Sequence, residues 1–78
     1  MSITANKFKG IRAAVVSECF SAKATRQHNN TNIICLGERV VGKGLALRIV
    51  DEWINAEFKG GRHEKRLKMI KKIEEENL

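Results

Sequence analysis

The segment from Ile11 to Gly37, IRAAVVSECFSAKATRQHNNTNIICLG, holds two short apolar runs separated by a more polar stretch. The runs cover residues 11–16 and 32–37, and their length, β-branched residues and polar borders are typical of buried strands. Two such strands joined through a helix are expected to pair in parallel. The segment therefore predicts a strand–helix–strand unit and an α/β fold class.

The stretch between the two runs, FSAKATRQH, consists mostly of residues with good helix propensity. Ser17 or Ser21 is expected to cap the start of this helix, because a serine hydroxyl accepts a hydrogen bond from the unpaired backbone N–H groups there. Asn29 and Asn30 are expected to end it, because asparagine tolerates the left-handed backbone conformation common at helix C-termini.

On the C-terminal side, apolar residues recur at every fourth position of residues 41–58, with charged residues on the other side. This pattern predicts an amphipathic helix, which a glycine pair at 60–61 is expected to end. A last helix with a narrow apolar stripe is predicted over residues 62–76. The two apolar rows are Leu45, Ile49 and Trp53 in the first helix and Leu67, Ile70 and Ile73 in the second.

On the N-terminal side, residues 2–8 are interpreted as the end of a helix that Gly10 closes. The predicted order is then helix end, strand, helix, strand, helix, helix. A sheet of two parallel strands keeps unpaired backbone groups along both outer edges. We therefore expect the chain to form the second half of an α/β domain, with the rest of the sheet supplied by another polypeptide or by another part of a longer one.

The chain has 78 residues, enough for one small domain, and a formal net charge of +6. A basic chain can bind nucleic acid through phosphate contacts alone. The charge is diffuse, however, since residues 30–56 balance three Lys/Arg against three Asp/Glu. The aromatic residues also do not alternate with basic ones as they do on base-stacking platforms. Nucleic-acid binding is therefore the weaker hypothesis.

Cys19 and Cys35 are the two cysteines of the chain, and their spacing is not that of a zinc site. Two cysteines do not make a disulfide framework, and no signal peptide is recognisable, so a reduced cytoplasmic location is expected. No apolar run approaches the length of a membrane span, and no membrane partner is expected.

His28 lies at the predicted end of the first full helix, next to Asn29. A capping role would explain it without any function, since a protonated imidazole is favourable near a helix C-terminus. Imidazole also titrates near neutral pH, so His28 can act as a proton shuttle while Asn29 orients a substrate hydroxyl. Because this helix returns toward the next strand, His28 is expected at the sheet edge opposite the strand carboxyl ends.

Arg62 and Arg66 are four residues apart and therefore share one face of the last predicted helix. Arginine in the first turns of a helix opposes the helix dipole, which is favourable if an anion binds there. Two guanidinium groups and unpaired backbone N–H groups suit a phosphate, although a solvated basic face would also explain them. Arg39 follows the second strand, where ligands of open α/β sheets bind, and is a third candidate.

Three stretches together resemble one known family. SITANKFKGIRAAVV, SAKATRQHNNTNIICLGERVVG and EFKGGRHEKR are similar, in this order, to the C-terminal half of ribose-5-phosphate isomerase B. That family, shared with the galactose-6-phosphate isomerase subunits, interconverts aldose and ketose phosphates without a metal or organic cofactor. The resemblance covers essentially all 78 residues, and RQHNN together with GGRHEKR is its most specific part.

The resemblance implies a role for each candidate residue. The histidine that matches His28 helps to open the furanose ring, and the asparagine that matches Asn29 contacts the sugar. Asn6 matches a position near the substrate loop and is carried over as substrate-binding. The phosphate is held by arginines at the positions of Arg39, Arg62 and Arg66.

The family fold is a Rossmann-like three-layer α/β/α domain with a parallel sheet, and its active sites are built from two subunits of a dimer or of a dimer of dimers. We therefore expect residues 1–78 to form the C-terminal half of such a domain, with the helix at about 62–76 packed against a partner subunit. The family's Asp-His pair, and its Cys or Ser base beside a Gly-Thr-Gly loop, have no counterpart in this sequence. The 78 residues by themselves are expected to be inactive.

Together these observations favour conversion of ribose 5-phosphate to ribulose 5-phosphate, in the pentose phosphate pathway, by proton transfer through an enediolate. The alternative is a non-enzymatic basic module that binds nucleic acid or a partner protein. Sugar-phosphate binding that depends on Arg62 and Arg66 would support the first hypothesis. Binding that falls steeply with salt would support the second.

Overall fold

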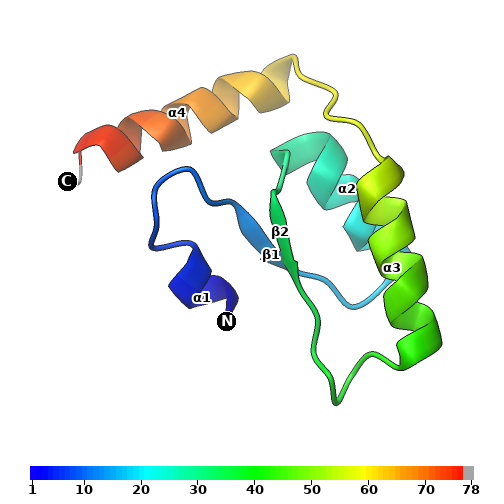
Figure 1. The fold of residues 1–78 in the computed structure, drawn as a ribbon. Coiled ribbons are helices and arrows are strands. Elements are labelled where there is room, and N and C mark those ends of the chain that lie inside the picture. The colour runs from blue at the N-terminus through cyan, green and yellow to red at the C-terminus, as the bar shows by residue number, and fades with distance from the viewer. Residues whose placement is uncertain (77–78) are drawn as a thin grey trace.

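The computed structural model describes residues 1–76 (Figure 1). The last two residues of the predicted 1–78 domain lie outside this part of the chain. The described part contains four helices and two strands. Their bounds in chain order are Ser2–Ala5 (α1), Ala13–Val15 (β1), Cys19–Asn29 (α2), Ile33–Cys35 (β2), Lys43–Asn55 (α3) and Arg62–Glu76 (α4).

The two strands pair in parallel, with Ala13 opposite Ile33 and Val15 opposite Cys35, and α2 connects them as predicted. Each strand has three residues and is shorter than the apolar run that predicts it. The carboxamide of Asn32 extends the pairing. Its oxygen accepts the backbone N–H of Arg12 at 2.9 Å, and its nitrogen donates to the Gly10 carbonyl at 2.8 Å. The side chain thus adds to the backbone pairing at the start of the sheet, where the Asn32 N–H donates to the Arg12 carbonyl at 3.0 Å.

The hydrophobic core lies between one face of the sheet and the helices α2 and α3, while α1 lies on the other side of β1 (Figure 1). Val16 is 2% exposed and Ile49, at the middle of the predicted apolar row of α3, is 0% exposed. The opposite face of the sheet is open at Val15, which is 69% exposed. The remaining buried apolar residues are Ala22 and Val41, packed with Ala14, Cys19, Ile34, Leu36, Ala46 and Trp53.

The start of α2 corrects one prediction, because Glu18 caps this helix rather than Ser17 or Ser21. The Glu18 carboxylate accepts the backbone N–H of Ser21 at 3.0 Å and also its hydroxyl. Hydrogen bonds from the Ser21 side chain and backbone lower the pKa of Glu18. A carboxylate satisfies the unpaired N–H groups as a hydroxyl would, and its charge also interacts favourably with the helix dipole.

The end of α2 confirms a prediction, because Asn30 adopts the left-handed conformation with φ 44°. The amphipathic helix ends at Asn55, earlier than expected, and the segment 56–61 leads to α4. Gly60 and Gly61 both have positive φ, of 65° and 60°, in this linker. The predicted last helix, residues 62–76, is confirmed, and its first turns lie near the end of α2 (Figure 1).

None of the helices within residues 1–76 combines the length and the apolar character needed to cross a membrane.

Candidate functional site

The C-terminal end of α2 is tied to several other segments through its backbone carbonyl groups. The Gln27 carbonyl accepts the backbone N–H of Lys59 at 3.0 Å, which joins the α3–α4 linker to α2. The Asn30 carbonyl accepts Nε of Arg12 at 2.9 Å, which joins the start of β1 to the same turn. Because carbonyls at a helix end have no partner within the helix, these donors fix the backbone that carries His28.

A second set of contacts holds the turn from the inside. Thr31 is 4% exposed, and its hydroxyl accepts the indole N–H of Trp53 at 2.9 Å. Its carbonyl accepts Nη1 of Arg26 at 2.6 Å. The same Arg26 guanidinium lies over the Trp53 ring, 5.3 Å from the centroid. These contacts form a clamp that fixes the chain directly after His28 and Asn29. The clamp consists of Arg26, Thr31 and Trp53.

Arg66 of α4 reaches across to the end of α2. Its Nη2 atom donates to Oδ1 of Asn29 at 2.6 Å and to the carbonyl of His28 at 3.3 Å. Because Oδ1 accepts the guanidinium, the Asn29 amide nitrogen is the group of that side chain that can donate to a ligand. The structure thus brings three predicted site residues, His28, Asn29 and Arg66, together from two helices.

The ring of His28 stacks on the ring of His63, the second residue of α4. The ring centroids are 4.5 Å apart and the planes differ by 16°. One nitrogen of His63, Nδ1, is buried and has no hydrogen-bond partner among the described residues 1–76. The two histidines therefore form a packed pair at the junction of α2 and α4.

The surroundings of this histidine pair are cationic. Burial lowers the pKa of His63, and the positive charges of His28, Arg62, Arg66 and Lys59 lower it further. These groups come from α2, from the linker and from α4. Mutual repulsion among them opposes folding, which a bound anion would offset.

Arg62, the first residue of α4, is exposed and belongs to this cationic cluster. The backbone N–H groups at the start of a helix attract anions, so Arg62 stands beside a further source of positive potential. Glu64, the acidic residue in the first turn, pairs with Lys68 at 3.7 Å on the exposed side of α4. The cationic cluster consists of five residues: His28, Lys59, Arg62, His63 and Arg66.

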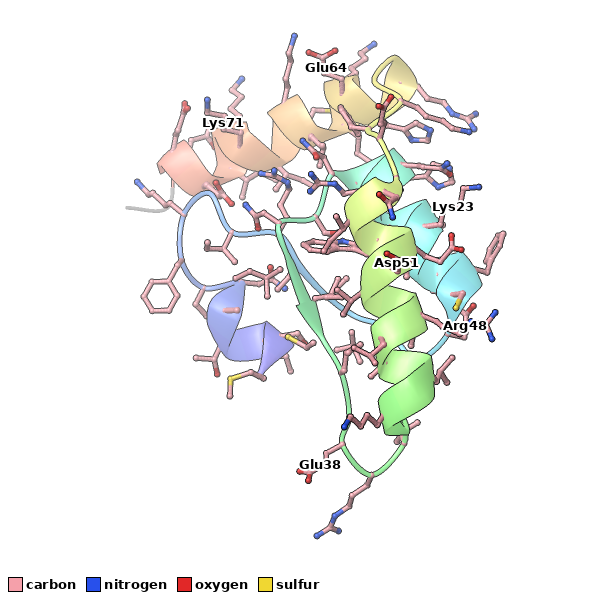
Figure 2. All side chains as sticks on the ribbon, turned by 45° about the vertical axis from the view of Figure 1, so that its right-hand side comes forward. Lys23, Glu38, Arg48, Asp51, Glu64 and Lys71 are labelled. Carbon is pink, nitrogen blue, oxygen red and sulfur yellow. The ribbon has the colours of Figure 1, made fainter. Side chains whose placement is uncertain are left out.

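Two predicted site residues lie elsewhere. Arg39 is exposed in the turn after β2, and Figure 2 shows its neighbour Glu38 at the opposite end of the molecule from Glu64 of α4. Asn6 follows α1, and its carboxamide accepts Ala13 N–H at 2.7 Å and donates to the Ala13 carbonyl at 2.9 Å. Asn6 thus occupies the outer edge of β1 as a neighbouring strand would.

The chemistry of the cationic cluster suits an anion. Guanidinium and ammonium groups donate hydrogen bonds to phosphate or carboxylate oxygens, and imidazole can transfer a proton near neutral pH. Within residues 1–76, no three His, Cys, Asp or Glu side chains gather in a way that could hold a metal ion. The arrangement can therefore bind a phosphorylated compound and move a proton beside it.

Sequence reasoning missed His63, Lys59 and the clamp formed by Arg26, Thr31 and Trp53. His63 stands next to Arg62 within GGRHEKR, so a second histidine beside a predicted phosphate ligand was an available signal. The clamp carries no such signal, because its residues are ordinary helix and turn residues until the fold brings them together.

The sequence of residues 1–70 matches the family model described as Ribose/Galactose Isomerase. The chain belongs to the ribose/galactose isomerase family. A relative within this family, ribose-5-phosphate isomerase B of Escherichia coli, is 55% identical over 75 residues, which cover 96% of this chain and 50% of the relative.

Solved structures of the ribose/galactose isomerase family superimpose closely. Ribose-5-phosphate isomerase B of Clostridium thermocellum matches with a TM-score of 0.95 and 55% identity, over 99% of this chain and 52% of that one. The Mycoplasma genitalium enzyme with bound ribulose-5-phosphate matches with a TM-score of 0.95 and 41% identity, over 97% of this chain and 50% of that one. The chain thus spans about half the length of these relatives.

These matches confirm the predicted resemblance to the ribose/galactose isomerase family. They also confirm the Rossmann-like α/β fold class, of which this chain has two parallel strands and four helices in its described part. The roles assigned to individual site residues stay predictions.

Proposed function

We propose that this chain takes part in the isomerisation of ribose 5-phosphate to ribulose 5-phosphate, a reaction of aldose and ketose phosphates. The observation that carries the proposal is the cationic cluster, where Arg66 holds Asn29 at 2.6 Å beside the stacked ring of His28. The names of the relatives and the ribulose-5-phosphate bound to the Mycoplasma genitalium structure support the choice of substrate class.

Each residue of the cluster has a distinct task in this proposal. Arg62 and Arg66 hold the phosphate with charge-assisted hydrogen bonds. His28 transfers a proton between the ring oxygen and the hydroxyl at the anomeric carbon, which opens the furanose. The amide nitrogen of Asn29 donates to a sugar oxygen, since Oδ1 is bound to Arg66.

Arg39 has a place in this scheme only if two copies of the chain share a site. In one copy its neighbour Glu38 lies at the opposite end of the molecule from Glu64 of α4 (Figure 2), so Arg39 cannot bind the phosphate held by Arg62 and Arg66. A shared site would combine Arg39 of one subunit with the cationic cluster of another. The proposal therefore includes a dimer or a larger oligomer in the cytoplasm. It also includes Asn6 as a substrate-binding residue, which hydrogen bonds to Ala13 hold beside β1.

The proton transfer between C1 and C2 of the open sugar needs a base. Arginine side chains keep their protons at neutral pH, and His28 is assigned to ring opening. His63 is stacked on His28 with its Nδ1 buried, so the proposal does not assign this step to it either. We therefore propose that the base comes from structure beyond the cluster. Residues 1–78 alone are expected to bind ribose 5-phosphate without converting it.

Calorimetric titration of the chain with ribose 5-phosphate tests the phosphate site. Loss of one charge-assisted hydrogen bond costs about 1.5–3 kcal/mol, so Arg62→Ala and Arg66→Ala should each weaken binding by roughly 10- to 100-fold. Arg48→Ala is the matched control, because Arg48 is an exposed arginine of α3 far from α4 (Figure 2). Arg66→Lys keeps the charge without the planar fork and should have an intermediate effect.

The same experiment can overturn the proposal. Equal affinities for the Arg62, Arg66 and Arg48 variants would show that the cluster does not hold the sugar phosphate. Affinity for duplex DNA that falls steeply with salt, without affinity for ribose 5-phosphate, would instead favour a basic module that binds nucleic acid.

A further inference from the structure

His63 has no task in the proposed function, although it contacts the residue assigned to proton transfer. Its ring lies face to face with the ring of His28, at 4.5 Å between centroids and 16° between planes. Within residues 1–76, neither ring nitrogen of His28 makes a hydrogen bond. The stacking contact covers one face of the His28 ring, and both ring nitrogens have no hydrogen-bond partner within these residues.

The surroundings of His63 favour its neutral form. A protonated imidazole carries N–H on both nitrogens, whereas the buried Nδ1 of His63 has no acceptor among the described residues. The titratable and charged groups that lower its pKa are His28 from α2, Lys59 from the linker, and Arg62 and Arg66 from α4. Glu64, the next residue of α4, is paired with Lys68 and does not compensate them.

We propose that His63 is a positioning residue for His28: a neutral imidazole whose face fixes the plane of the His28 ring. Two imidazolium rings at stacking distance would repel each other, which disfavours a positive charge on His63. The inference rests on the proposed function for the role of His28 in ring opening. The stacking and the neutral state of His63 can be tested without any substrate.

The test is NMR of the chain without ligand, with the His28 Cε1–H signal as readout, because an aromatic ring stacked on His28 displaces this signal through its ring current. His63→Ala should move the His28 signal toward that of a free histidine. His63→Phe, which keeps an aromatic face but cannot titrate, should restore it. In the unchanged chain, His63 should titrate below the ordinary histidine pKa, and cross-relaxation should connect the two rings.

Several results would overturn the inference. The His28 signal could stay in place in His63→Ala, or His63→Phe could displace it as far as His63→Ala does. If His63→Ala fails to fold, the unchanged chain still decides, since a His63 that titrates at or above the ordinary histidine pKa would not be the neutral partner. Loss of ribose 5-phosphate binding in a chain with normal stacking would count against the proposed function and leave the positioning role standing.

Discussion

The two ends of the sheet differ in how their loops are held. At the amino end, Arg66 donates to the His28 carbonyl in the last turn of α2 and Arg12 donates to the Asn30 carbonyl just after it, and both arginines come from other segments of the chain. At the carboxyl end, the turn of residues 36–42 is closed by its own backbone, since the N–H groups of Val40 and Val41 both donate to the Gly37 carbonyl at 2.9 and 2.8 Å. The amino end is fixed by the tertiary structure, and the carboxyl end by local structure.

This difference indicates which end of the sheet has side chains already held in position for a ligand. The His28–Arg66 region is cross-linked by hydrogen bonds from α3, α4 and the start of β1, so its side chains are held in place before a ligand arrives. Arg39 stands on an exposed turn, anchored nearby through the buried side chain of Val41. Preorganised groups bind a ligand at lower entropic cost than mobile ones, which favours the amino end as the main binding surface.

The largest effect is expected from a substitution in the hydrophobic core, which supports both ends of the sheet. Ile49 is 0% exposed and packs with Val16, Ala22 and Val41. Ile49→Ala should lower the free energy of unfolding by about 2–5 kcal/mol, because it leaves a cavity in a small core. Amide hydrogen exchange should accelerate together in residues 28–31 and 36–42.

The matched control for this change is Leu47→Ala on the same helix, where the side chain is 65% exposed. That variant should stay within about 0.5 kcal/mol of the unchanged chain. Faster exchange at one end alone in Ile49→Ala would contradict the view that one core supports both ends.

A smaller effect should be confined to the amino end. Arg26→Ala removes the donor to the carbonyl of buried Thr31 at 2.6 Å and the cation over Trp53. An unsatisfied buried acceptor costs about 1–3 kcal/mol, so chemical denaturation should show a loss of this size. Amide hydrogen exchange should accelerate in residues 28–31 and stay unchanged in 36–42, as expected if the clamp supports the amino end alone. Equal acceleration in both segments would show that the two ends are not held separately.

The smallest effect is a dependence of stability on pH that arises at the amino end alone. Burial, and then the nearby positive charges, lower the pKa of His63, so the unfolded chain takes up this proton first as the pH falls. The free energy of unfolding should therefore decrease as the pH drops below about 6.5, and His63 should have no such effect at higher pH. Urea unfolding at a series of pH values measures this slope.

His63→Phe provides the comparison for the pH series, since phenylalanine cannot titrate. The decrease below about pH 6.5 should become shallower in this variant. The capping carboxylate of Glu18 acts in a separate range, because its pKa is lowered from an ordinary value near 4.5 and its contribution is lost only in more acid solution. An unchanged slope in His63→Phe would assign the pH dependence to other groups.

Much of the fold could be predicted from local patterns. The period of apolar residues indicates the helices, and the extent of α4 agrees with residues 62–76 as expected. The left-handed residue at the end of α2 also follows from its asparagines. Strand length could not be read from the apolar runs, because at the start of the sheet the Asn32 carboxamide binds the Arg12 N–H and the Gly10 carbonyl.

The site could be predicted only in part, for a reason of geometry. His28, Asn29 and Arg66 stand out by residue type, and the structure brings them together. The order of elements does predict that Arg39 and His28 lie at opposite edges of the sheet, because Arg39 follows a strand and His28 ends the helix that returns to the next strand. It does not reveal that α4 comes to lie beside His28. The contact between His28 and His63 joins positions 35 apart along the chain and needs the first turns of α4 to lie near the end of α2.

The linker of residues 56–61 has a consequence for how the site tolerates change. Its two glycines in left-handed conformation and the bond from Lys59 to Gln27 set the point at which α4 starts. Each residue of an α-helix advances the side-chain direction by roughly 100°. One extra residue between Lys59 and Arg62 would therefore shift the start of α4 and displace Arg66 from Asn29, while leaving every chemical group in the sequence. Spacing here is as much a determinant of recognition as composition.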